Sequence, residues 1–376
     1  MVNEKKTLVI IGGGYAAMAL IDELAKKGLK NLEIVLISQT NYFFHNVASP
    51  RALVDESVIS KICIPYDMKM KKVNGRFIHA RVVSMSTSHV NYNKIVDNKE
   101  DKNESLNFDY LVLAFGCVQS HPFAADNYDK SNQISSLQGI NEKLKKANRI
   151  LLVGGGSVGS ETAGEFATDH PNKKITLLTT SDRLVPSMDP GFSNKVLNIL
   201  RQKNVEVIFN DRVDLTNVEN YKSQKIKTRN GKDLEFDAYF VCVGVKPYKE
   251  LFEKSDLTSW LNPNGFVKVN KYLQVADQKN VFAIGDCCDL DEPKMAYKTT
   301  FHAAIVAHNL NDLIVNGGGY PKEYKPSNMP MMLLTLGRDN GVLRFSCFLL
   351  QGFLPRLGKA RDLFIPKFRK EMGYSP

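Results

Sequence analysis

The sequence has few cysteines and no arrangement of them that marks a site. Six occur in 376 residues, and none of them forms a C-x-x-C pair. This excludes a disulfide-stapled scaffold and a cysteine-based zinc site, and it favours a reducing compartment. The six are Cys63, Cys117, Cys242, Cys287, Cys288 and Cys347. We interpret the adjacent Cys287 and Cys288 as two buried thiols.

Long hydrophobic runs are also missing. No stretch reaches the roughly 18 to 20 apolar residues that a membrane-spanning helix needs. The first expected strand begins near Thr7, which leaves no room for a signal or transit peptide. We therefore expect a cytoplasmic protein, either free or held at the periphery of a membrane from the cytosolic side.

The sequence has few histidines, and its basic residues outnumber its acidic ones. The seven histidines are scattered, and the closest pair, His302 and His308, does not share a helix face, so no metal site is expected. Fifty Lys and Arg against forty Asp and Glu leave a charge of +10, which favours anionic partners. With 43% hydrophobic residues, the chain has ample core material for two or three domains of roughly 150 residues.

A glycine-rich turn follows the first apolar run. Residues 8–11 read as a buried strand, a helix extends to Lys27, and residues 33–38 read as a second strand. Between strand and helix, Gly12-x-Gly14-x-x-Ala17 matches the dinucleotide-binding pattern. The helix N-terminus then faces a pyrophosphate. The candidate binding residues are Gly12, Gly13, Gly14, Tyr15, Ala16 and Ala17.

The same pattern recurs 142 residues later. Residues 150–153 read as a strand, residues 160–168 as a helix and residues 174–178 as the next strand. The glycines between them, Gly154, Gly156 and Gly159, are candidates for a second dinucleotide site. Two such motifs in matching contexts predict an α/β fold with two Rossmann-like domains.

Three further strand ends complete the pattern. Residues 109–116 and 237–244 are apolar runs that each end in glycine, and residues 281–286 end in Gly285-Asp286. The carboxylate of Asp286 could accept hydrogen bonds from a polyol chain, or it could cap a turn or helix.

Together these blocks resemble the two-dinucleotide-domain flavoprotein oxidoreductases with the glutathione-reductase-like fold. Within them the sequence is most similar to the ferroptosis-suppressor type of apoptosis-inducing factor (the mitochondria-associated 2 group), which is related to the type II NADH dehydrogenases. The blocks that carry this resemblance are His45-Asn46-Val47-Ala48, Gly154-Gly155-Gly156-Ser157, Ala283-Ile284-Gly285-Asp286-Cys287, Pro293-Lys294-Met295-Ala296-Tyr297 and Lys359-Ala360-Arg361-Asp362-Leu363-Phe364.

The resemblance implies FAD in the first glycine motif. Arg51 would then lie near the pyrophosphate, although it could instead be a solvated surface cation. Val82 would contact the adenine, Gly116 would close the site, and Asp286 would bind the ribityl or pyrophosphate region. A helix starting near Tyr297 would point its positive end at the flavin ring.

The second motif would bind NADH or NADPH. Glu161 matches the family's carboxylate near the nicotinamide, although it could instead be a helix glutamate favoured by the dipole. We interpret Glu165 as an ordinary helix residue. Lys359, with Phe364, would flank the headgroup of a quinone, the acceptor that the resemblance implies. Glu161 and Lys359 are therefore the two candidate catalytic residues.

The sequence departs from the usual pattern in three places. The acidic residue expected about 20 residues after each glycine motif is missing. At the first site, its absence weakens the expected binding of the FAD ribose. At the second site, its absence leaves NADPH as well favoured as NADH, because Arg183 and Lys173 or Lys174 are near enough in sequence to attract a 2′-phosphate. Position 2 is Val rather than the Gly that myristoylation requires.

The C-terminal region alternates apolar and basic residues. This pattern fits either a membrane surface or a subdomain packed on the flavin domain. The apolar residues are Phe345, Phe348, Leu349, Leu350, Phe353, Leu354 and Leu357, and the basic ones are Arg356, Lys359, Arg361, Lys367, Arg369 and Lys370.

The expected activity is hydride transfer from NAD(P)H to FAD and then to a quinone-type acceptor. A disulfide substrate is disfavoured because no cysteine pair lies beside the expected flavin. Two alternatives stay open: an interaction protein that binds nucleic acid, against which the charge is diffuse, and a reductase of a small redox protein.

The order of the motifs predicts a discontinuous domain. We expect an FAD-binding domain from residues 1–125 and 248–312, an NAD(P)H-binding domain from 126–247, and a C-terminal segment, 313–376, that faces a membrane or quinone. Residues 94–107 read as a hairpin or surface loop, and residues 317–321 as a linker.

Overall fold

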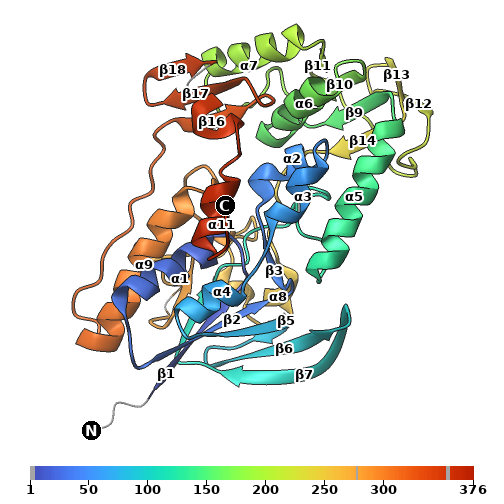
Figure 1. Ribbon diagram of the computed structural model, residues 1–376. Coiled ribbons are helices and arrows are strands. Elements are labelled where there is room, and N and C mark those ends of the chain that lie inside the picture. The colour runs from blue at the N-terminus through green and yellow to red at the C-terminus, as the bar shows by residue number, and fades with distance from the viewer. Residues whose placement is uncertain (1–4, 277, 353–355) are drawn as a thin grey trace.

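The computed structural model describes residues 5–276, 278–352 and 356–376. Two α/β units lie one above the other, and the C-terminal segment contacts both of them (Figure 1). This arrangement confirms the predicted fold class, whereas the predicted domain boundaries stay a prediction.

The first unit is built on a seven-stranded sheet of order β15-β8-β1-β2-β5-β6-β7. Five of its strands are parallel, and their apolar residues are buried on both faces, as in β1, where Leu8, Val9 and Ile10 have no exposed surface. The parallel strands are β1 (Lys6–Ile11), β2 (Leu32–Ser38), β5 (Arg76–Met85), β8 (Tyr110–Leu113) and β15 (Val281–Ala283). Helices α1 (Tyr15–Lys27) and α9 (Lys298–Asn316) pack side by side against this sheet (Figure 1).

The edge of the first sheet is the antiparallel pair β6 (His89–Val96) and β7 (Lys99–Asn107). Of the two structures expected for residues 94–107, the hairpin is therefore the one observed. β15 joins the sheet beside β8, although about 170 residues separate the two strands in sequence. The chain therefore leaves this unit and returns to it.

The second unit has a four-stranded parallel sheet of order β11-β10-β9-β14. Its strands are β9 (Arg149–Val153), β10 (Lys174–Leu178), β11 (Glu206–Ile208) and β14 (Ala238–Val241), and its helices are α5 (Lys130–Lys146), α6 (Ser157–Asp169) and α7 (Pro190–Gln202). Helix α6 begins three residues earlier than predicted because Gly156, in extended conformation, is its N-cap. An antiparallel bridge between Val118 and Lys246 joins the two connections between the units.

Short elements complete the two units. They are β3 (Tyr42–Phe44), β4 (Cys63–Pro65), β12 (Gln224–Lys227), β13 (Asp233–Phe236), α2 (Ser49–Ala52), α3 (Glu56–Ile62), α4 (Asp67–Lys72), α8 (Glu250–Glu253) and three 3₁₀ turns, Asn46–Ala48, Thr258–Trp260 and Gly285–Cys287.

The C-terminal segment begins after residues 317–330, which contain no helix or strand, as predicted for the linker at 317–321. It forms an antiparallel sheet, β16 (Met331–Thr335), β17 (Gly341–Phe345) and β18 (Phe348–Gln351), then a π-helical turn, Arg356–Ala360, and helix α11 (Ile365–Glu371). The sheet packs on α6 and α7, and Phe368 of α11 packs on Tyr15 and Phe43 of the first unit. Among the described residues, no helix is both long and apolar enough to cross a bilayer.

Candidate functional site

A single cavity of about 1320 Å³ runs between the first unit, the second unit and the C-terminal segment. Its walls include the first glycine turn, the carboxyl end of β2, the start of α9, the first turn of α6 and strands β16 and β17. The predicted residues that line it are Gly12, Gly13, Gly14, Tyr15, Ala16, Val82, Gly116, Glu161, Asp286 and Lys359. Ala17 is fully buried beneath the turn.

The first glycine turn has no room for side chains where it is tightest. Gly12 has φ +97°, and a Cβ there would lie 2.5 Å from Phe115 Cα. At Gly14, in contrast, nothing lies within 4 Å of the corresponding position. The backbone at the start of α1 is therefore open to a ligand, as a pyrophosphate on a helix N-terminus requires.

Asp286 lies on the opposite wall of the cavity, in the 3₁₀ turn after β15. The turn is fixed partly by the Cys117 thiol, which donates to the Asp286 backbone carbonyl at 3.1 Å. Within the described residues the Asp286 carboxylate accepts no hydrogen bond from a side chain or backbone group, and burial raises its pKa. A half-buried carboxylate without a donor fits a ligand hydroxyl. The glycine turn and Asp286 together fit FAD.

Arg51 is not where the sequence placed it. Its guanidinium lies away from the cavity, with 2% of the side chain exposed, and donates to both carboxylate oxygens of Glu165, at 2.9 and 2.7 Å. A third hydrogen bond reaches Arg361 O at 3.0 Å. Neither expectation for Arg51, pyrophosphate contact or solvated surface cation, describes this position. Glu165, which we interpreted as an ordinary helix residue, is its buried partner.

Glu161 and Lys359 meet at the cavity wall, although 198 residues separate them. Lys359 Nζ lies 2.6 Å from Glu161 Oε1, and each side chain is 11% exposed. The Thr335 amide and hydroxyl both donate to the same oxygen at 3.1 Å. The two candidate catalytic residues thus form one charge pair, held between α6 and the C-terminal segment.

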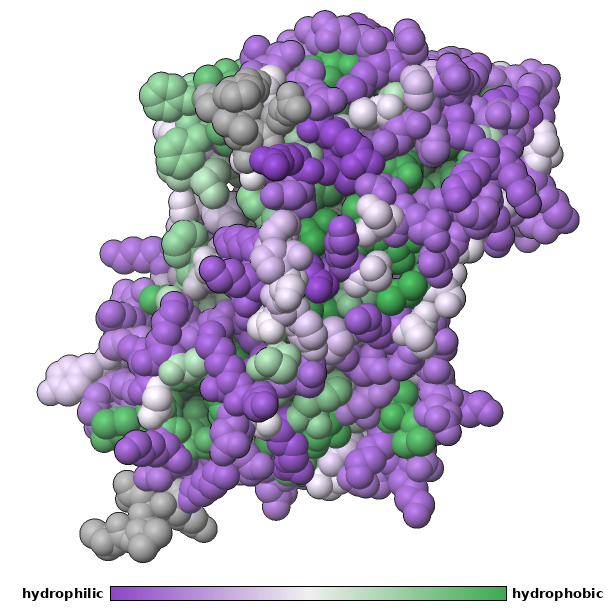
Figure 2. Space-filling model, viewed as in Figure 1, coloured by the Kyte–Doolittle hydropathy of each residue, from purple (hydrophilic) through white to green (hydrophobic). Residues whose placement is uncertain are grey.

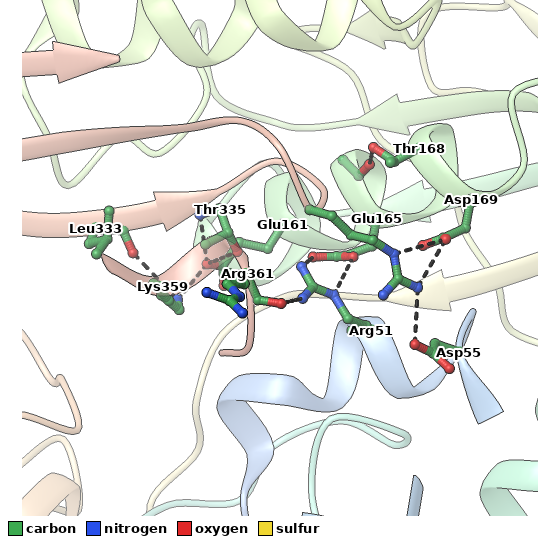
Figure 3. A network of polar contacts seen from close by, with 12 residues as sticks. Arg51, Asp55, Glu161, Glu165, Thr168, Asp169, Leu333, Thr335, Lys359 and Arg361 are labelled. Carbon is green, nitrogen blue, oxygen red and sulfur yellow. Dashed lines mark hydrogen bonds and ion pairs between the residues drawn. The ribbon is translucent and has the colours of Figure 1, made fainter. Parts of the chain in front are cut away.

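Three carboxylates on one face of α6 each hold a cation from another part of the chain (Figure 3). Glu161 pairs with Lys359, Glu165 with Arg51, and Asp169 with Arg338, which also contacts Asp55 of the first unit. The spacing of four residues puts the carboxylates on one side of the helix. This row of ion pairs fixes the C-terminal segment against both units. The sequence shows the four-residue spacing of the carboxylates but not which cations pair with them.

His45 is a buried residue that sequence reasoning quoted without giving it a role. Its Nε2 donates to Leu363 O at 2.7 Å, and its Nδ1 pairs with the Tyr15 hydroxyl at 2.9 Å. Burial lowers the pKa of His45 to about 4.

This shift predicts a loss of stability in acid. Between pH 6.5 and 4 the unfolded chain binds a proton at His45 that the folded chain excludes, so the free energy of unfolding falls as the pH is lowered through this window. From pH 7.5 to 5.0, we expect His45 to contribute about 2 kcal/mol of that loss. Urea unfolding of wild type and His45→Gln at both pH values measures it, and parallel losses in the two proteins would contradict the prediction.

The second glycine motif is as tight as the first. A Cβ on Gly159 would lie 1.9 Å from Gly154 O, which only glycine permits. Gly154, Gly156 and Gly159 do not line the cavity, but Ser157 and Val158 of the same turn do. Beyond the end of β10, Arg183 donates to Pro186 O at 3.3 Å and, among the described residues, has no ion pair.

Two glycine turns of this kind, a shared cavity between two parallel sheets and a lone carboxylate opposite the first turn define a flavoprotein oxidoreductase with two dinucleotide-binding units. Comparison with known proteins agrees. The family model for pyridine nucleotide-disulphide oxidoreductases matches residues 6–309. The chain is 35% identical to apoptosis-inducing factor homolog B of Dictyostelium discoideum, covering 99% of this chain and 98% of that protein. It is 32% identical to human ferroptosis suppressor protein 1, covering 98% and 96%.

The fold is also that of solved enzymes. The sulfide:quinone oxidoreductase of Aquifex aeolicus superposes with a TM-score of 0.75 at 18% identity, covering 98% of this chain and 92% of that one. NDH2 of Plasmodium falciparum in complex with NADH gives 0.75 at 16%, covering 93% and 92%. The chain belongs to the pyridine nucleotide-disulphide oxidoreductase family and is an FAD-dependent NAD(P)H oxidoreductase.

The family name includes disulphides, but the described part of this chain has no cysteine pair at the cavity. Cys117 is the one cysteine in the lining, whereas Cys287 and Cys288 are buried behind the turn.

Proposed function

We propose that this protein transfers electrons from NAD(P)H through FAD to a quinone. The observation that carries the proposal is the continuity of one cavity from the glycine turn and Asp286 to an apolar branch lined by Met331, Met332, Leu333 and Leu343. An apolar ring compound could enter that branch and reach the Glu161–Lys359 pair. The name of the Aquifex relative, a sulfide:quinone oxidoreductase, is consistent with such an acceptor on this fold.

Each residue has a chemical task in this proposal. Bound FAD supplies a hydride acceptor that can pass two electrons to a second substrate. The glycine turn and the α1 N-terminus bind the pyrophosphate, and Asp286 accepts hydrogen bonds from the ribityl chain. Val82 and its neighbours line the adenosine end.

The Glu161–Lys359 pair stabilises the negative charge that develops on the quinone oxygen. Reduction of a quinone by NAD(P)H takes up one proton besides the hydride, giving NAD(P)⁺ and the quinol. The Lys359 ammonium donates a hydrogen bond to the quinone oxygen and is a proton donor at the cavity wall. Glu161 holds that ammonium in place and compensates its charge.

The first test is a spectrum of the purified chain. We expect a yellow protein whose flavin band bleaches on anaerobic addition of NADH or NADPH and recovers on addition of a short-chain ubiquinone. A flavin that bleaches but never recovers with quinone would refute the quinone acceptor. Recovery with a small redox protein instead would favour the alternative reductase.

We further propose that the second site accepts NADPH. Arg183 lies just beyond β10, where NAD-specific sites carry a carboxylate, and the residues at the strand end are Thr179, Thr180 and Ser181. Replacing Arg183 by Ala should lower kcat/KM for NADPH about tenfold relative to NADH, because one charge-assisted contact to the 2′-phosphate is lost. Arg201→Ala, in the last turn of α7, removes the same charge as a control. An unchanged ratio in Arg183→Ala would contradict the assignment.

Exposed apolar side chains on β17 and β18 favour contact with a lipid surface. Phe345, Phe348 and Leu350 are 47%, 62% and 38% exposed, and Figure 2 shows hydrophobic side chains gathered over these strands. Phe345 also lines the cavity, so the patch borders the branch that a lipid-soluble quinone would enter. Phe353 and Leu354, which the sequence analysis added to this group, lie outside the described residues. Membrane contact is thus combined with packing on the second unit.

Vesicle binding tests this contact. Phe348→Ser should weaken co-sedimentation with phosphatidylcholine and phosphatidylserine vesicles about tenfold, since burial of one aromatic side chain is lost. Val315→Ser, which removes another side chain that is 63% exposed, is the matched control. Equal binding by both variants and wild type would place the lipid contact elsewhere or exclude it.

A further inference from the structure

A buried polar cluster lies directly behind the Gly285–Cys287 turn, and its centre is Glu292. The Glu292 carboxylate is 4% exposed. Lys298 Nζ and His302 Nε2 each approach it to 2.8 Å, and the Tyr324 hydroxyl lies 2.9 and 2.8 Å from its two oxygens. The Ser327 amide donates at 3.3 Å. Burial acts to raise the pKa of Glu292, but these donors lower it overall, so the group is a carboxylate.

On one side, the cluster supports the cavity turn. The Gly285 amide donates to His302 Nδ1 at 3.0 Å. A backbone amide can only donate, so Nδ1 carries no proton, and the neutral imidazole presents Nε2–H to Glu292. Burial lowers the pKa of His302, consistent with the neutral form. A chain of two hydrogen bonds therefore runs from Glu292 through His302 to the amide of Gly285, the residue before Asp286.

On the other side, the cluster holds the linker. Residues 317–330 have no helix or strand, and they are held both by backbone bonds, such as Tyr324 N to Lys271 O at 2.7 Å, and by side chains of α9 and Glu292. Besides the bonds of Tyr324 and Ser327 to Glu292, the Tyr324 ring packs edge-on against His302 with centroids 4.6 Å apart. Lys298 Nζ also contacts the Ser327 carbonyl. The same linker leads into β16 and onward to Lys359.

The two sides are close but separate. A cavity of about 10 Å³, enough for about one water molecule, lies between them and is lined by Gly285, Asp286, Glu292 and His302 among others. Tyr324 does not line the large cavity, so it can influence a ligand there only through its neighbours: the turn, or the lining residues Pro293, Lys294 and Thr299 beside Glu292 and Lys298.

We propose that Glu292 is a positioning residue that couples cofactor binding to the order of the linker. This inference rests on FAD occupying the large cavity, but not on the identity of the electron acceptor. When the turn is fixed by a ligand at Asp286, His302 and Glu292 are fixed with it, which strengthens the linker's contacts to Glu292 beside those that Asn309 and Asp312 make. By reciprocity, an anchored linker tightens binding at the turn.

Variants on opposite sides of the cluster test this coupling. Tyr324→Phe keeps the ring on His302 and removes one of the linker's two donors to Glu292, the other being the Ser327 amide. We expect it to raise the FAD dissociation constant about threefold, although Tyr324 does not line the large cavity. Asp286→Asn changes only the cavity side, and it should speed amide hydrogen exchange of residues 317–330 in the full-length protein. Glu292→Gln should do both, with FAD binding weakened about tenfold.

The control is Tyr320→Phe, a matched change at a linker tyrosine that is 77% exposed. It should leave both FAD binding and linker exchange unchanged. If Tyr324→Phe speeds amide hydrogen exchange of the linker but leaves the FAD dissociation constant at the wild-type value, the cluster only holds the linker in place and the proposal is wrong. Should Glu292→Gln fail to fold, the effect of Tyr324→Phe on FAD binding and the effect of Asp286→Asn on linker exchange still test the coupling. A protein that binds FAD but reduces no quinone would refute the proposed function and leave this coupling intact.

Discussion

Replacing Glu161 by Gln is expected to lower the turnover number for quinone reduction about 100-fold while FAD stays bound. Glutamine keeps an oxygen that the Thr335 amide and hydroxyl can donate to, but it removes the negative charge 2.6 Å from Lys359 Nζ. The ammonium is then left almost buried without a counter-charge and is no longer held toward the cavity. A 100-fold loss corresponds to about 2.7 kcal/mol, which is within the cost of breaking a buried pair.

Stopped-flow spectroscopy separates the two half-reactions of this variant. Bleaching by NAD(P)H and recovery with a short-chain ubiquinone are followed independently, and Lys359→Met should impair the second step at least as strongly. Glu142→Gln, at a glutamate whose side chain is 61% exposed, is the matched control and should behave as wild type. Turnover numbers within threefold of wild type for both Glu161→Gln and Lys359→Met would contradict the proposed role of the pair.

The second large effect is on stability and concerns Arg51. Replacing Arg51 by Leu should lower the free energy of unfolding by about 4 kcal/mol, because it leaves the Glu165 carboxylate, 1% exposed, without its two hydrogen bonds. Burial raises the pKa of Glu165, and the Arg51 guanidinium is the group that opposes this shift. Loss of the arginine therefore favours protonation of Glu165.

A double-mutant cycle measures the Arg51–Glu165 pair. Glu165→Leu should cost a similar amount, and the double variant should recover part of the loss because no unpaired charge is left buried. The exposed pair Lys145–Glu142 gives the control, since Lys145→Ala should cost less than about 0.5 kcal/mol. If urea unfolding shows both single variants at Arg51 and Glu165 within 1 kcal/mol of wild type, the pair does not stabilise the fold.

Both predictions concern the same row on α6. Lys359, Arg51 and Arg338 come from three places in the sequence, and each ends on a carboxylate of this helix (Figure 3). The buried pair in the middle anchors the helix to α2, and the pair at the cavity end is the one that we propose acts on the acceptor. Stability and turnover can therefore be tested separately on neighbouring turns of one helix.

Both nucleotide-binding units could be predicted from local patterns in the sequence. The glycine turns at Gly12 and Gly154 were readable because such a turn needs a backbone conformation that favours glycine, and the structure has φ +97° and +121° there. The parallel strands were readable because burial on both faces requires continuous apolar runs. The family resemblance, carried by these same blocks, added the cofactors and the class of enzyme.

The pairing of the buried charges could not be predicted from the sequence and is seen only in the folded chain. Arg51 was expected at a pyrophosphate and instead pairs with Glu165, 114 residues away, and Lys359 meets Glu161 across 198 residues. Glu292 gathers its donors from α9 and from Tyr324 and Ser327, which the sequence analysis did not single out. The reason is physical: turns and strands follow from interactions between near neighbours, whereas a buried ion pair depends on how separately folded elements dock against one another.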